Sequence, residues 1–127
     1  MKLTFRLFLV GVVALVFSAC DKNTEYVDAK VLINDFRTNQ KKAVELYLDK
    51  EIVVAVPIQV MLPNGNDGIM ISYNDYIGIN NIEFYIPKIH IESAKKIKVN
   101  TVQLIQGICS EGGGSKDVIF RNCKVIQ

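Results

Sequence analysis

The sequence predicts an α+β fold that is mostly β, in which one N-terminal helix packs on five strands. Two periodicities predict it. Between about residues 27 and 48, apolar residues recur at steps of three and four, which is the period of a helix. After residue 50 the period changes to two, and isoleucine, valine and aromatic residues alternate with polar ones between turn residues, which indicates strands. A third observation sets residues 1–19 apart from this domain.

Residues 1–19 have the organisation of a signal peptide. Lys2 and Arg6 precede the apolar run Leu7–Phe17, and two small residues come directly before Cys20, as in the three regions of a secretory signal. Eleven apolar residues reach only about 16 Å as a helix, about half of the hydrocarbon core. We therefore expect cleavage before Cys20 and no permanent membrane span.

A cysteine at the cleavage point predicts a lipoprotein. The segment Phe17-Ser18-Ala19-Cys20 resembles the bacterial lipobox, with Phe17 where leucine is usual. The Cys20 thiol can take a diacylglycerol and its freed amine a further acyl chain, and multiple chains anchor a protein stably. We expect the mature chain to be extracytoplasmic, in the cell envelope or periplasm, and held at a membrane by lipid on Cys20. Residues 20–26 form the lipidated cysteine and a short polar tether, and residues 27–127 form the domain.

The mature chain is expected to be neutral. The sequence has 15 Lys and Arg against 13 Asp and Glu, and two of the basic residues leave with the signal peptide, so 13 of each sign remain. Nothing in this balance predicts a polyanion as partner. About a hundred residues suffice for one small domain and one core.

The helix is expected to begin near the N-cap Thr24 and to end at Asp49-Lys50. Pro57 stands in the middle of the first strand, where its missing N–H predicts a sharp bend. Residues 88–98, with the basic cluster Lys95, Lys96 and Lys98, are expected to form a short helix or an irregular crossing. The Gly112–Ser115 loop is expected to join the last two strands as a hairpin. The five strands are expected at Ile52–Leu62, Ile69–Tyr73, Ile82–Ile86, about 99–109 and about 117–126.

One helix, then five short strands with a longer crossing after the third, is compatible with the OB-fold, a five-stranded, partly open barrel. Particular residues narrow the choice: Asn39, Ala43, Tyr47, Lys50 and Val54, then Gly107, Cys109, Asp117-Val118, Phe120 and Asn122-Cys123. Over nearly the whole mature chain this pattern resembles the tRNA-anticodon-binding-like (tRNA_anti-like) OB-fold family of small bacterial proteins. The resemblance implies the helix packed on an OB-fold barrel, and it carries no established activity.

The sequence departs from the family in two places. Val56-Pro57 stands where glycine is usual in the bend of the first strand. The spacing from Val102 to Gly107 is one residue long, which suggests a bulge or a shifted register. The match of Asn39, Ala43 and Tyr47 is explained most simply by packing of the helix, with Asn39 bonding a strand carbonyl.

No catalytic residue, metal site or cofactor is predicted, and we do not expect an enzyme. His90 has no partners grouped around it in the sequence, although a general base or a metal site would need them. The glycine-rich loop joins two strands, whereas phosphate loops begin a helix. We interpret Asn64–Asp67 as a turn, since it lacks the terminal glutamate of a Ca²⁺ loop.

Cys109 and Cys123 are candidates for a disulfide in an oxidising compartment. A hairpin centred on Gly114, however, puts Cys109 opposite about Ile119, roughly 13 Å from Cys123 along the strand, whereas a bridge needs Cα atoms within about 7 Å. A bulge near Arg121-Asn122 would reduce that gap without closing it. Two buried thiols are the alternative.

Three tyrosines, Tyr73, Tyr76 and Tyr85, lie near the second and third strands, where OB-folds bind oligonucleotides or oligosaccharides. Tyr73 shares a face with Ile69 and Ile71 and so is also a candidate for the core, and Tyr85 is the better surface candidate. The function expected is therefore a lipid-anchored binding module for a protein partner or an envelope glycan. The alternatives are single-stranded nucleic-acid binding, against which charge and location argue, and a purely structural envelope protein.

Overall fold

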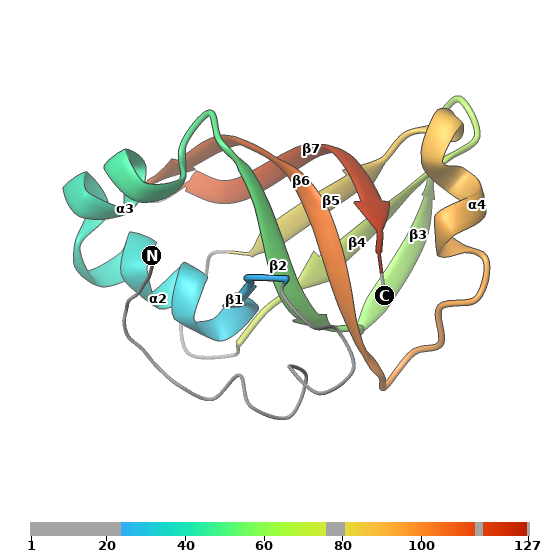
Figure 1. Ribbon diagram of the computed structural model, residues 1–127, viewed down its shortest axis with the longest axis horizontal. Coiled ribbons are helices and arrows are strands. Elements are labelled where there is room, and N and C mark those ends of the chain that lie inside the picture. The colour runs from blue at the N-terminus through green and yellow to red at the C-terminus, as the bar shows by residue number, and fades with distance from the viewer. Residues whose placement is uncertain (1–23, 76–80, 114–115, 127) are drawn as a thin grey trace.

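The computed structural model describes residues 24–75, 81–113 and 116–126, and these form a mostly β domain with helices at two places (Figure 1). The signal peptide predicted at residues 1–19 and the lipid site predicted at Cys20 lie outside the described residues. In chain order the elements are β1 (Val27–Asp28), α2 (Ala29–Thr38), α3 (Gln40–Tyr47), β2 (Glu51–Pro57), β3 (Val60–Asn64), β4 (Gly68–Tyr73), β5 (Ile82–Ile86), the 3-10 turn η1 (Lys88–His90), α4 (Ile91–Ala94), β6 (Val102–Gly113) and β7 (Lys116–Val125).

The strands make one sheet in the order β1-β2-β6-β7-β5-β4-β3. β1 pairs with β2 and β5 with β7 in parallel, and the other pairs are antiparallel. The first predicted strand corresponds to β2 and β3. Its first half, β2, pairs with β6, which is the fourth predicted strand, and its second half, β3, pairs with β4, which is the second. This double pairing curls the sheet around one core, as the predicted fold requires.

Two details of the predicted barrel are corrected: among the described residues the sheet has seven strands instead of five, and it is not closed into a barrel. The first predicted strand is divided after Pro57, which cannot donate to a ladder. The backbone of Ile58 still bonds to the segment that leads into β6, donating to Thr101 O at 2.8 Å and accepting from Asn100 N at 2.9 Å, and the chain bends to β3 after it. The predicted bend at Pro57 is thus confirmed. The seventh strand is Val27–Asp28, which we predicted as helix and which pairs with Val54 and Ala55.

The single predicted helix is divided into α2 and α3 at Asn39, whose φ of −148° and ψ of 71° are not helical. Asn39 Oδ1 accepts a hydrogen bond from Lys42 N at 3.3 Å and caps α3. No hydrogen bond from the Asn39 amide to a strand carbonyl is formed among the described residues, so that prediction is wrong, and the side chain caps α3 instead. The N-cap of α2 is Asp28 rather than Thr24. The predicted exit is confirmed, since α3 ends at Tyr47 and Asp49 has a positive φ of 64°.

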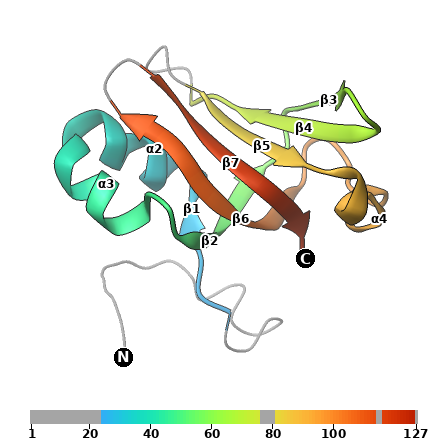
Figure 2. The same ribbon diagram turned by 90° about the horizontal axis from the view of Figure 1, so that it is seen from above.

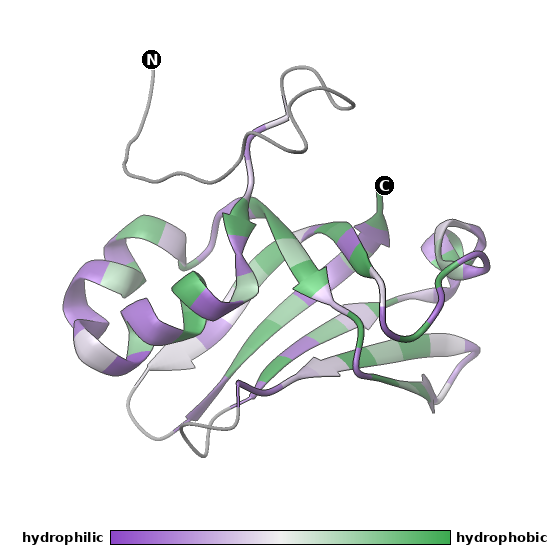
Figure 3. Cartoon of the chain, turned by 90° about the horizontal axis from the view of Figure 1, so that it is seen from below, coloured by the Kyte–Doolittle hydropathy of each residue, from purple (hydrophilic) through white to green (hydrophobic). Residues whose placement is uncertain are grey.

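The core lies between the N-terminal helices and the inner face of the sheet. Helix α2 contributes four buried residues at helical spacing, Ala29, Leu32, Ile33 and Phe36. Strand β5 buries alternate residues, and Phe84 stacks on Phe120 of β7 with ring centroids 5.1 Å apart. Figure 3 shows apolar residues along the strands and polar ones over much of α2 and α3. The crossing predicted at residues 88–98 is η1 and α4, which pack on β7.

Strands β6 and β7 form the predicted hairpin, with irregular register. Gln106 pairs with Lys124 and Ile108 with Arg121, so β7 has one more residue than β6 over this stretch. Asn122 has a φ of 54° there. The bulge predicted near Arg121-Asn122 is confirmed, and it lets β7 bend over the core.

Candidate binding site

The candidate site is a row of side chains on the outer face of the sheet, which we call the outer row. Its members alternate with core residues along their strands and are placed side by side by the register. Leu62 of β3 pairs with Met70 of β4, Met70 with Tyr85 of β5, and Ile108 of β6 with Arg121 of β7. Tyr85 and Arg121 each follow one member of the Phe84–Phe120 pair, which puts them next to each other.

The outer row is open to solvent. Leu62 is 48% exposed and Ile108 38%, and the Arg121 side chain is 55% exposed. Met70 and Tyr85 are partly exposed between them. Apolar side chains of this size normally lie inside, so a contiguous exposed row is typical of an interaction surface.

Tyr85 is held at the centre of the outer row by two charged neighbours. Its hydroxyl donates to Glu83 Oε1 at 2.7 Å, and the Arg121 guanidinium carbon lies 5.2 Å from the ring centroid. The hydrogen bond to Glu83 raises the pKa of the Tyr85 hydroxyl, and partial burial raises it further. Arg121 also faces Glu111 at 3.9 Å. The arrangement presents a fixed ring face beside a cation that is already partly balanced.

Of the three tyrosines predicted for a binding face, only Tyr85 lies on the outer row. Tyr73 is 5% exposed and belongs to the core, so its place on a binding face is wrong and its alternative place in the core is right. Ser72, its neighbour in β4, points to the outer side instead and pairs with Glu83. Tyr76 lies outside the described residues. Arg121 and Met70 were not predicted, because only the register brings them next to Tyr85.

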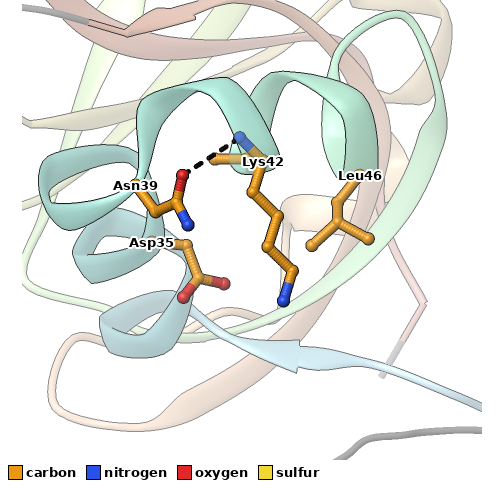
Figure 4. A pocket seen from close by; sticks show the side chains of 5 residues that line it. Asp35, Asn39, Lys42 and Leu46 are labelled. Carbon is orange, nitrogen blue, oxygen red and sulfur yellow. Dashed lines mark hydrogen bonds between the residues drawn. The ribbon is translucent and has the colours of Figure 1, made fainter.

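A second candidate site is a hollow against the N-terminal helices (Figure 4). It is a half-open cavity of about 180 Å³ lined by Asp35, Asn39, Lys42, Ala43 and Leu46. The Tyr47 hydroxyl donates a hydrogen bond to Asp35 Oδ2 at 2.7 Å. Burial is the largest cause of the raised pKa of Tyr47, and this hydrogen bond is the next. Asn39 is used as a helix cap, and Lys42 is exposed. The cavity is small and its polar groups are largely engaged, so it is the weaker candidate.

Cys109 and Cys123 are free thiols, both fully buried in the core. The disulfide considered for them is not formed in the structure, where Phe120 stands opposite Cys109. Burial raises the pKa of each thiol to about 12. Cys123 instead packs on Gly107, where a Cβ would meet its Sγ at 2.5 Å.

A part-buried ion pair ties α2 to the end of β4. Arg37 Nη1 and Nη2 donate to the two carboxylate oxygens of Asp75, each at 3.1 Å, and the Asp75 side chain is 2% exposed. No pattern in the sequence signalled this contact.

In the part of the chain that the structure describes, no group of three or more His, Cys, Asp or Glu side chains is placed to hold a metal ion. Among the same residues, no helix has the length and apolar character to cross a bilayer.

The chain is similar to several proteins of known structure. A "putative nucleic acid-binding lipoprotein" from Klebsiella pneumoniae is 17% identical and superposes with a TM-score of 0.65, over 82% of this chain and 92% of that one. Aspartyl-tRNA synthetase from Entamoeba histolytica is 15% identical with a TM-score of 0.53, and an aspartyl-tRNA synthetase from Leishmania major is 11% identical with the same score. The matches cover 86% and 87% of this chain but only 22% of each synthetase. At these identities, the likeness establishes a shared fold.

No match was found among curated proteins. The tRNA_anti-like family model matches residues 10–125, which is nearly the whole chain. The family resemblance first noted in the helix and in the closing Gly-x-Cys and Asp-Val-x-Phe-x-x-Cys segments is thereby confirmed. The chain belongs to the tRNA_anti-like family.

Proposed function

We propose that this protein is a lipid-anchored, non-enzymatic binding module that holds an envelope glycan on the outer row. The observation that carries the proposal is the open face made by Leu62, Met70, Tyr85 and Ile108 beside Arg121. Sugar rings present flat apolar faces between hydroxyl groups, and an aromatic ring with flanking polar groups matches that chemistry. The fold family supports a binding role at this part of the sheet.

The charge of the outer row favours an uncharged ligand over a polyanion. Arg121 is its cation, and Glu111 and the Glu83 that holds Tyr85 lie beside it. Binding to a phosphate backbone depends on several basic side chains acting together. The mature chain has equal numbers of acidic and basic residues and therefore no surplus of positive charge.

The lipid anchor is part of the proposal. It is supported by the lipobox-like segment that ends at Cys20 and by the name of the Klebsiella pneumoniae neighbour, which is called a lipoprotein. An anchored module with a short tether works close to the membrane surface, where envelope glycans are within reach.

Single-stranded nucleic acid is the second candidate ligand. One observation favours it: a tyrosine ring covered by an arginine, as in Tyr85–Arg121, is also a platform on which a base can stack. The name of the Klebsiella pneumoniae neighbour points the same way. The two candidates differ in their expected response to salt.

The test is titration of the mature chain carrying Cys20→Ala with a soluble peptidoglycan-derived oligosaccharide and with a thymidine oligonucleotide, each at two salt concentrations. We expect salt-insensitive binding of the oligosaccharide, weakened about tenfold or more by Tyr85→Ala and little by Tyr85→Phe, since loss of a stacked ring costs about 1–3 kcal/mol. Leu46→Ala, at a side chain 45% exposed on α3 and away from the outer row, is the matched control. Tight, salt-sensitive oligonucleotide binding would replace the glycan proposal with the second candidate, and binding of neither would favour a structural role.

The anchor is tested by the intact mass of the membrane-extracted protein. A diacylated chain that begins at Cys20, and its loss in Cys20→Ala, are the expected results. A full-length chain without lipid would refute the anchor and leave the binding surface to be judged by titration.

A further inference from the structure

The outer side of strands β2 and β6, which also carries Ile108 of the outer row, has a second apolar stretch that extends from Gln106 toward Val102. We call it the β2–β6 outer face. The register of β2 and β6 pairs its members: Val53 with Gln106, Ala55 with Leu104, and Pro57 with Val102. Ile126, just after β7, joins them by donating its N–H to Leu104 O at 2.9 Å. The run Ile52–Val56 is apolar at every position, whereas β5 alternates apolar and polar residues. β2 is therefore apolar on both faces, which is typical of a strand covered on both sides.

Side chains on this face differ in exposure. Ala55 and Leu104 are 3% and 1% exposed, although neither belongs to the core cluster. Around them Val102 is 49% exposed and Ile126 38%, and Val99, in the segment that leads to β6, is 50% exposed. Three large apolar side chains are thus presented to the surroundings of one sheet face.

The described chain begins at this face. β1 pairs with β2, and Asp28 stands beside Ala55. Figure 2 shows β1 and the C-terminus on one side of the molecule and β3 and β4 on the opposite side. Cys20 precedes Val27 by seven positions, which span at most about 25 Å. A membrane that holds Cys20 is therefore within reach of the β2–β6 outer face.

The charges around this face are mixed. Lys98 and Lys124 are exposed, and so are the acidic residues Glu25, Asp28 and Glu51, of which Glu51 lies on β2 two positions before Val53. The headgroup layer of a bilayer accepts such a surface, because lysines and short apolar side chains both have partners there.

We propose that, in the anchored protein, the β2–β6 outer face lies on the headgroup layer of the bilayer that holds Cys20. β3 and β4, with the Leu62 end of the outer row, are then turned away from the membrane toward the ligand. The orientation rests on the lipid anchor of the proposed function. It goes beyond that function by stating which surface the membrane covers.

The experiment uses the lipidated full chain in vesicles of phosphatidylethanolamine and phosphatidylglycerol that contain a headgroup nitroxide lipid. One fluorophore is attached to Val102→Cys and, in a second protein, to Leu62→Cys. These side chains are matched, at 49% and 48% exposed, and Val102 lies on β6 beside β2 whereas Leu62 lies on β3 beside β4. Cys109 and Cys123 are 0% exposed, and burial raises their pKa to about 12, so they stay unlabelled at neutral pH.

We expect several-fold stronger quenching at position 102 than at position 62. Equal quenching, or stronger quenching at position 62, would overturn the orientation, and so would no quenching at either position, which would leave the face to a protein partner. Ile126→Cys serves as a second label on the same face if the first variant fails to fold. The intact mass of each sample shows whether lipid is present: a chain without lipid refutes anchor and orientation together, whereas a lipidated chain without the difference refutes the orientation alone.

Discussion

Gly107→Ala is a direct test of how the β6–β7 hairpin packs. A Cβ at position 107 would lie 2.5 Å from Cys123 Sγ and 3.2 Å from Arg121 O. Cys123 is 0% exposed, so its thiol has little room to move away. The substitution therefore overfills the core where β7 bulges at Asn122.

We expect Gly107→Ala to lower the free energy of unfolding by about 1–3 kcal/mol, the usual cost of overpacking a core. At about 4–8 °C per kcal/mol for a domain of this size, a loss of about 2 kcal/mol lowers the Tm by roughly 8–16 °C. Cys123→Ala alone removes buried sulfur and should cost about 1 kcal/mol. In the double variant the added methyl occupies the vacated space, so the loss should fall short of the sum by about 1–2 kcal/mol.

The assay is urea unfolding of the mature chain with Cys20→Ala, followed by far-ultraviolet circular dichroism. Gly65→Ala is the matched control, because no atom lies within 4 Å of its added Cβ and its φ is not positive. That variant should be neutral or slightly stabilising. Strict additivity of Gly107→Ala and Cys123→Ala would refute the proposed contact between them.

Three further results are expected from the same unfolding assay. Asn39→Ala removes the cap of α3 and should cost about 0.5–2 kcal/mol; an unchanged midpoint would mean that the cap is not used. Asp75→Asn leaves Arg37 without its paired charge, and since the arginine side chain is 25% exposed, the loss should be about 2 kcal/mol, below that for a fully buried pair. Burial raises the pKa of Cys109 and Cys123 to about 12, so above pH about 9 the unfolded chain loses these protons first and stability should fall as pH rises. Equal urea midpoints at pH about 8 and about 10.5 would contradict that reasoning.

Much of the fold could be predicted, because local periodicity reflects burial. The alternation in β5 and the bend at Pro57 were both readable, and so was the hairpin with its bulge near Asn122. Two boundaries were not. Asn39 divides the helix because its side chain bonds to the backbone three residues later, although helical periodicity continues across it. Val27–Asp28 becomes a strand only because β2 offers an edge to pair with.

The candidate site could be predicted only in part. Tyr85 was identified because it alternates with the inward residues of β5. Tyr73 shares a face with Ile69 and Ile71, so the sequence left both a surface and a core position possible for it. Arg121 and Met70 could not be placed next to Tyr85, since their contact depends on the register of β5 with β4 across a loop and with β7, which lies far from β5 in the sequence. Side chains that meet through tertiary pairing leave no periodic signal.

The strand order has a consequence for the time at which the chain can fold. β6 and β7 come last in the chain among the described strands, yet they stand in the middle of the sheet, between β2 and β5. Until residues 102–125 are available, β2 and β5 each lack their principal neighbour, and the aromatic stack of Phe84 on Phe120 cannot form. Such long-range pairing makes folding slow and late. A sheet with this strand order can be completed only once residues 102–125 are available, so the order of synthesis delays closure of the core.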